Sequence, residues 1–147
     1  MTSQISFTIG YLARETSCKV QTIRYYEQVG LMPKSQRSSG NQRIYGPAQL
    51  QRLRFIRHAR DLGFSQNEIR ELLRLADHPE QSCKAVTTIT KRHLVEIENK
   101  IAQSTALRDE FQRMIAQCPG KRQIADCRII AALADHDLHS SSHSQAS

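Results

Sequence analysis

The strongest structural signal in the chain lies in residues 8–30, TIGYLARETSCKVQTIRYYEQVG. Thr8 is a suitable N-cap for a first short helix, whose apolar residues recur at helical spacing. A second helix follows directly, with Val20 and Ile23 on its apolar side, and Gly30 ends it. Two short helices joined by a tight turn predict a helix-turn-helix.

The character of the sequence changes in residues 31–45. The run Ser-Ser-Gly-Asn at 38–41 is typical of a turn, and the residues that flank it can pair as short strands. This pattern predicts a small β-hairpin, or wing. The wing carries Lys34, Arg37 and Arg43, which can reach phosphates beside a DNA site that the second helix reads.

Two further helices are predicted after the wing. Pro47 suits the first position of a helix that runs to about Leu62, and Gly63 follows it. Ser65 caps the next helix, with Glu68 in the capping-box position. We expect their buried faces to consist of Leu50, Leu53, Phe55, Ile56, Ile69, Leu72, Leu73 and Leu75.

A long helix is predicted from Ser82, because no Gly or Pro interrupts the chain until Pro119. Apolar residues recur along it at close to the spacing of a coiled-coil seam. A helix of this length cannot bury its apolar stripe alone, so we expect two copies of the chain to pair through it. The stripe consists of Val86, Ile89, Leu94, Ile97, Ile101, Leu107, Phe111 and Ile115.

Positive charge is concentrated in the first half of the chain. Residues 1–75 hold twelve Lys or Arg and five Asp or Glu, whereas residues 76–147 hold nine of each. The formal charge of +7 therefore belongs to the first half, which favours a nucleic-acid partner over a merely soluble basic protein. With neither a secretion signal nor an apolar run of roughly 20 residues, we expect a cytoplasmic protein.

Three of the four cysteines can converge on one site. Cys83 and Cys118 lie 35 positions apart at the ends of the predicted helix, roughly 50 Å at about 1.5 Å per residue. They cannot bind the same ion within one chain, but antiparallel pairing places Cys118 beside Cys83 of the partner subunit. The loop 119–126 can then bring Cys127 to them. Three thiolates favour soft or borderline ions such as Hg(II), Pb(II), Cd(II) or Zn(II).

Other interpretations of these side chains stay open. A free cysteine often packs as a small apolar residue, and we expect this for Cys18 in the helix-turn-helix. The other three thiols could instead serve a redox or electrophile sensor. His78 is a candidate fourth ligand, whereas His58 and His93 are expected on helix surfaces or at the dimer seam. An enzyme is not expected, because the sequence has no Cys-X-X-Cys, phosphate loop or Ser/His/Asp constellation.

These elements together predict a mainly α protein. A winged helix-turn-helix DNA-binding domain is expected at 1–76, and a linker with a long antiparallel coiled-coil dimerisation helix at 77–117. A metal-binding loop with a short helix follows at 118–134. The Ser- and His-rich tail at 135–147 is expected to be disordered.

The run TIRYYE at 22–27, then Gly30-Leu31, and Gly40-Asn41 with Arg43 and Tyr45, resembles the MerR family of transcription regulators. The resemblance extends to about residue 134. It implies a homodimer on a palindromic operator, in a promoter whose two elements are spaced too far apart for RNA polymerase. Metal binding would reshape this DNA rather than release it. We expect Tyr26 to pack in the core and DNA contacts to come from Lys19, Thr22, Arg24, Tyr25, Arg37, Asn41, Arg43 and Tyr45.

Resemblance within the family bears on the metal. A cysteine at the position of Cys83 resembles the sensors of divalent ions, because the copper(I) sensors have Ser there. The spacing of the three cysteines is similar to the lead and mercury sensors. The zinc sensors carry an additional Cys directly after the one that matches Cys118, where this chain has Pro119. We therefore expect Pb(II) or Cd(II), with Hg(II) or Zn(II) as further candidates.

Overall fold

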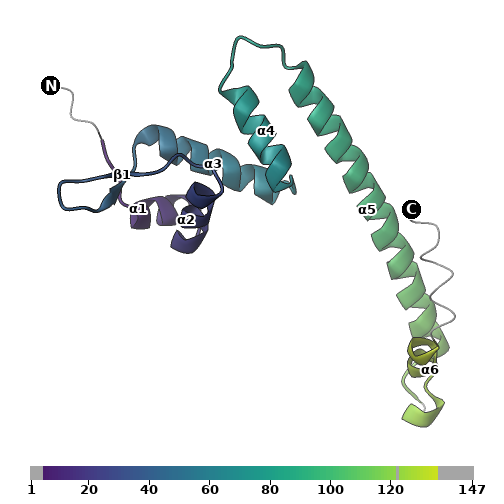
Figure 1. Ribbon diagram of the computed structural model, residues 1–147. Helices are drawn as coiled ribbons and strands as arrows, with labels where there is room; N and C mark the ends of the chain where they lie inside the picture. Colours follow the sequence, from purple (N-terminus) through teal and green to yellow (C-terminus); the bar gives the residue numbers. More distant parts are fainter. Residues whose placement is uncertain (1–4, 122, 136–147) are drawn as a thin grey trace. The chain divides into compact units, whose positions relative to one another are not determined.

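The computed structural model describes residues 5–121 and 123–135, and they are mainly helical (Figure 1). The predicted tail and its histidines at 136, 139 and 143 lie outside the described residues. The chain divides into two compact units, of which the first ends at His93 and the second begins at Leu94. The elements are α1 (Ile9–Thr16), α2 (Val20–Gln28), β1 (Gln36–Arg37), β2 (Arg43–Ile44), α3 (Pro47–Asp61), α4 (Gln66–Ala76), α5 (Lys84–Gln117), a 3₁₀ turn (Ile124–Asp126) and α6 (Arg128–Ala134).

The helix-turn-helix of the first unit forms as predicted. Thr8 caps α1, and its Oγ1 accepts a hydrogen bond from the Tyr11 N–H at 3.1 Å. Ser17 ends α1 in the left-handed conformation with φ of 53°, which lets the chain turn at once into α2. The next turn passes through Gly30 at φ of 81°, a conformation that glycine adopts without strain.

The wing is a two-stranded antiparallel hairpin. Gln36 pairs with Ile44 and Arg37 with Arg43, which confirms the predicted hairpin. Asn41 has a positive φ of 60° in its turn, and the Arg37 guanidinium donates to the Asn41 carbonyl at 3.1 Å. This bond fixes one of the wing's cations against the turn that carries it.

Helices α3 and α4 complete the first unit's core. Ser65 and Glu68 form the predicted capping box, in which each side chain accepts from the other residue's backbone N–H. Phe55 was expected inside, but its side chain is 39% exposed. It follows Leu53 by two positions, about 200° around the helix, so it cannot share the buried face of that residue. The core consists of Leu12, Cys18, Ile23, Tyr26, Leu31, Met32, Tyr45, Leu50, Leu53, Ile56, Ala59, Ile69 and Leu73.

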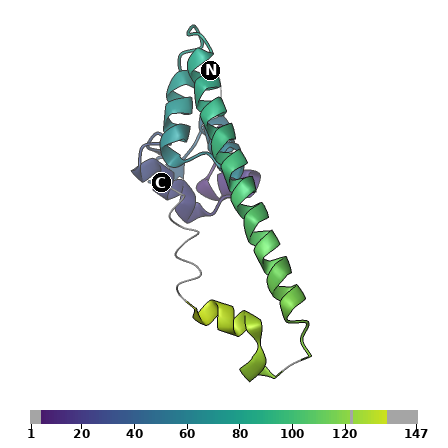
Figure 2. The ribbon, with the colours of Figure 1, turned by 90° about the vertical axis from the view of Figure 1, so that its right-hand side faces the viewer.

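Helix α5 is a single uninterrupted helix of 34 residues (Figure 2). The Ser82 Oγ accepts from the Lys84 N–H at 3.2 Å where the helix begins. Of the predicted apolar stripe, Ile89 is buried, whereas most of the other members are exposed in the single chain. No helix in the described part of the chain is long and apolar enough to cross a membrane.

His93 is buried in the first unit rather than on the surface. Its side chain is 7% exposed, its ring stacks on Phe64 with centroids 4.2 Å apart, and its Nε2 lies 2.9 Å from the Leu62 carbonyl oxygen. The prediction of a surface or seam position was therefore wrong, because the turn around Gly63 offers a carbonyl and an aromatic face to this ring. His58 is exposed, as expected.

The capping box gives a direct test of the α4 boundary. Replacing Ser65 by Ala removes the acceptor for the Glu68 N–H, and we expect the free energy of unfolding to fall by about 1 kcal/mol. Urea denaturation followed by circular dichroism, at one protein concentration, measures the change. Ser65→Asp keeps a capping oxygen and should stay close to the wild type. An equal loss in both variants would contradict the capping role.

Candidate nucleic-acid interface and metal centre

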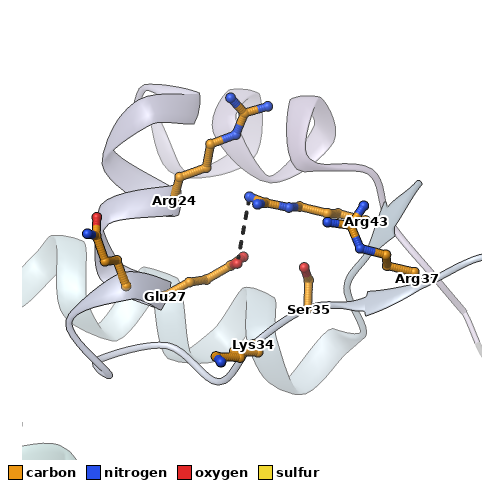
Figure 3. A pocket seen from close by; sticks show the side chains of 7 residues that line it. Arg24, Glu27, Lys34, Ser35, Arg37 and Arg43 are labelled. Carbon is orange, nitrogen blue, oxygen red and sulfur yellow. Dashed lines mark ion pairs between the residues drawn. The ribbon is translucent and has the colours of Figure 1, made fainter. Parts of the chain in front are cut away.

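Four cations surround a cavity of about 440 Å³ between the second helix and the wing (Figure 3). Arg24 reaches it from α2, Lys34 from the connecting loop, and Arg37 and Arg43 from the two strands. The structure thus brings together all three wing cations named from the sequence and one residue of the recognition helix. Cationic side chains clustered in this way are able to bind phosphates.

The exposed side of α2 carries other residues predicted to contact DNA. Lys19 and Arg24 are exposed, and Thr22 is half-buried. Tyr25 is 44% exposed, and its hydroxyl donates to Gln66 Oε1 at 2.9 Å, which ties the recognition helix to α4. Its neighbour Tyr26 is buried, which confirms the expectation that this tyrosine packs in the core.

The predicted DNA residues of the wing differ in exposure. Asn41 is exposed at the turn, whereas Tyr45 is only 1% exposed. The Tyr45 hydroxyl donates to Glu27 Oε1 inside the unit, and burial together with Glu27 raises the pKa of Tyr45 above its usual value. This conformation leaves Tyr45 no surface to offer a phosphate.

Several arginines of α3 stabilise the fold rather than forming the cation cluster. The Arg52 Nε donates to the Leu31 carbonyl at 2.7 Å, and the Arg57 Nη1 donates to the Ser17 carbonyl. Arg60 donates to the Tyr26 hydroxyl at 2.9 Å. These bonds satisfy polar groups where α1 and α2 end. The net charge of the first half is therefore shared between holding the helix-turn-helix and lining the cavity.

Cys118 and Cys127 lie together in the second unit. Their sulfurs are 3.4 Å apart, with Cys118 directly after α5 and Cys127 at the N-cap of α6. The hydrogen bond with Cys127 lowers the pKa of the Cys118 thiol, and the backbone N–H groups of Arg128, Gly120 and Ile129 also lower it. A thiolate at Cys118 is thus stabilised by groups of the loop that follows it and of the first turn of α6.

The geometry of this pair fits a shared ion. Two thiolates bound to zinc, with bonds of about 2.3 Å at a tetrahedral centre, place their sulfurs about 3.8 Å apart, close to the spacing seen here. Cys83 is exposed at the other end of α5, whose 34 residues span about 51 Å. The structure therefore brings together two of the three predicted ligands within one chain.

The fourth cysteine and the candidate imidazole ligand lie elsewhere. Cys18 packs in the first unit's core, which confirms its expected role. His78 Nδ1 lies 3.4 Å from Glu80 Oε1 in the linker before α5.

Comparisons with known proteins agree with these features. Two overlapping family models match, one described as MerR HTH family regulatory protein over residues 7–76 and one as MerR, DNA binding over residues 50–114. The HTH-type transcriptional regulator ZntR of Escherichia coli K12 is 40% identical over 129 residues, which are 86% of this chain and 92% of ZntR. The chain belongs to the MerR family.

Two more relatives of this MerR family member are named for metals. The mercuric resistance operon regulatory protein of Bacillus cereus is 33% identical over 129 residues, covering 88% of this chain and 98% of that protein. The crystal structure of PbrR691 from Ralstonia metallidurans CH34 in complex with lead(II) superposes with a TM-score of 0.75 at 38% identity. That match covers 87% of this chain and 99% of PbrR691.

The thiol pair gives a prediction in pH. Because the pKa of Cys118 is lowered chiefly through Cys127, Cys127→Ala should shift the alkylation of Cys118 to higher pH. Iodoacetamide labelling of the reduced, metal-free protein, quantified by peptide mass spectrometry across pH 6 to 10, measures the midpoint. An unchanged midpoint for Cys118 would contradict the assigned hydrogen bond.

Proposed function

We propose that this protein is a metal-responsive transcription regulator, which binds promoter DNA as a homodimer and senses a divalent soft metal ion through cysteine thiolates. The observation that carries the proposal is the Cys118–Cys127 pair, with sulfurs 3.4 Å apart directly after the long helix. Membership of the MerR family supports the DNA-binding half of the proposal. Its relatives ZntR, the mercuric regulator and lead-bound PbrR691 support the metal half.

In the DNA complex, α2 reads bases and the wing binds phosphates. Arg24 and Tyr25, with Lys19 and Thr22 beside them, lie on the side of α2 that is not packed in the core. Helices of this kind present their outer residues to base edges in the major groove. Lys34, Arg37, Asn41 and Arg43 approach the backbone beside the groove, and buried Tyr45 holds the wing in place.

The third thiolate comes from the partner subunit. Antiparallel pairing of two α5 helices covers their exposed apolar stripes and sets Cys83 of the partner subunit beside Cys118 and Cys127. Each dimer then holds two equivalent sites. Three thiolates on one ion leave a coordination position that water or another side chain can complete.

Among the metals, Pb(II) or Cd(II) is proposed first, with Hg(II) or Zn(II) next. The likeness to lead-bound PbrR691 and the similar likeness to ZntR both support a divalent metal, so the order among the metals rests on the cysteines. Pro119 directly follows Cys118, so the chain lacks a second adjacent thiol there. A site of three soft ligands suits large thiophilic ions without requiring a fourth protein ligand.

Activation follows from the position of these thiolates on the dimer. When all three thiolates bind one ion, Cys118 and Cys127 are drawn towards Cys83 of the partner subunit. Cys83 directly precedes α5, the helix that follows the DNA-binding domain. The heads can thereby be reoriented, which twists the operator between its half-sites so that RNA polymerase engages both promoter elements.

The same sulfur spacing also suits a redox sensor, which stays the alternative. Two thiols 3.4 Å apart within one chain can be oxidised to a disulfide without the partner subunit. A regulator of this kind would respond to peroxide in the absence of metal, and its response would not require Cys83. Metal and peroxide titrations of the same reduced protein distinguish the two functions.

Metal binding tests the proposal directly. Competition titration of reduced protein with Pb(II), Cd(II), Hg(II) and Zn(II), followed by thiolate-to-metal charge-transfer absorption, should give one ion per subunit. Cys127→Ser should lose tight binding and metal-induced transcription, yet still bind an operator duplex selected from a random pool by the wild type. Cys18→Ala removes a thiol from the core and is the matched control. If Cys127→Ser still binds metal tightly, Cys127 is not a ligand and the proposed site is wrong.

Mixed dimers test whether the site crosses the dimer. Neither Cys83→Ser nor Cys118→Ser alone should bind metal tightly, because each breaks both sites of its homodimer. A purified heterodimer of the two variants should regain one ion per dimer, since one site then receives all three thiolates. The two variants carry different affinity tags, so that the heterodimer can be purified and its bound metal counted per dimer. No recovery in a heterodimer that forms normally would indicate a site within one chain.

A further inference from the structure

One carboxylate lies among the cations of the proposed phosphate-binding surface. Glu27 lines the same cavity as Arg24, Lys34, Arg37 and Arg43 (Figure 3). Its side chain is only 9% exposed. An acid at this place weakens the attraction of the cavity for a phosphate, so its presence needs a physical reason.

Contacts of Glu27 join the recognition helix to the wing. Oε1 accepts from the buried Tyr45 hydroxyl, and Oε2 lies 3.8 Å from Arg43 Nη1. Tyr45 is also tied to the start of the chain by two backbone bonds with Phe7, at 2.7 and 2.9 Å. Glu27 therefore occupies a fixed position, with a partner at each carboxylate oxygen.

The pairing also removes part of the charge of Arg43 from the DNA-facing cluster. A cation held by a nearby carboxylate contributes less to the attraction of phosphates than a free one. Non-specific DNA affinity depends on the number of phosphates that such cations neutralise. Discrimination depends on how much tighter the operator binds than any other duplex.

Resting on the proposed DNA-binding function, we propose that Glu27 is a specificity-determining residue: its carboxylate restrains Arg43 and lowers affinity for DNA of any sequence. Because the same carboxylate fixes the wing on α2, a phosphate gains full contact only where the wing and the recognition helix both fit. Removing the negative charge of Glu27 should therefore raise the affinity for random DNA more than the affinity for the operator.

Glu27→Gln is the central variant, since it keeps the shape and an acceptor for Tyr45 but removes the charge. Affinity for a shuffled duplex at low salt should rise about three- to tenfold, and the salt slope should steepen by about 0.9, the effect of one freed cation. Affinity for the duplex selected by the wild type should change less. The ratio between the two affinities should therefore fall.

Two further variants separate this role from a general charge effect. Glu71→Gln removes the same charge from an exposed position of α4 outside the cavity, and both its salt slope and its specificity ratio should stay at the wild-type values. The double variant Glu27→Gln/Arg43→Gln should lose the gain of Glu27→Gln, because the freed cation is gone. Fluorescence anisotropy from 50 to 300 mM salt measures all of them.

Each outcome bears on one of the two proposals. A wild type that selects no sequence would refute the proposed function, whatever Glu27 does. If the wild type selects an operator and Glu27→Gln matches Glu71→Gln in slope and ratio, Glu27 has no specificity role. Glu27→Asp serves if Glu27→Gln does not fold: the shorter side chain holds the charge farther from Arg43, so a steeper salt slope supports the restraint and a wild-type slope contradicts it. Failure of both to fold would assign Glu27 to folding alone and overturn the inference.

Discussion

The length of α5 is the constraint on which the proposed sensing chemistry depends. An α-helix of 34 residues separates its ends by about 51 Å, and Cys83 and Cys118 stand at those ends. No side-chain movement within one chain can close that distance. A thiol from the far end therefore has to come from a second copy, and the exposed apolar stripe of α5 gives the two copies a reason to pair. In this arrangement, one feature of the sequence sets both the oligomeric state and the completeness of the metal site.

In the first unit, positive charge is divided between two tasks. Arg52, Arg57 and Arg60 donate hydrogen bonds to two backbone carbonyls and a tyrosine hydroxyl of the helix-turn-helix. The cations around the cavity remain available to phosphates, apart from the share of Arg43 that Glu27 holds. A count of basic residues thus overstates the charge that faces DNA. The residues that line the cavity therefore predict the DNA-facing charge better than the net charge of residues 1–75 does.

The elements were predictable because each has a local signal. Caps at Thr8 and Ser65 and the turn around Asn41 fixed the boundaries closely, and the capping box appeared with both of its bonds. Phe55 was misplaced against the geometry of its own helix, whereas the other errors concern side chains whose partners are distant in sequence. Burial of His93 depends on a carbonyl and a ring some thirty residues earlier. Tyr45 and Glu27 are 18 positions apart in the sequence, and the one hint of their hydrogen bond was an acidic residue close to the basic residues of α2 and the wing. No periodicity reports such contacts.

Polar contacts between elements have a consequence if, as the proposed function requires, the regulator remains on its promoter with and without its effector. Such a protein cannot rely on release from DNA as its signal, so its readout must come from the geometry of the bound heads. Geometry carries a signal only if the reading parts are rigid with respect to one another. The bond from Tyr25 to Gln66 and the bond from Tyr45 to Glu27 connect α2 to α4 and to the wing. On the proposed function, a reorientation of the head is then transmitted to bases and phosphates together, rather than being absorbed by a loose wing.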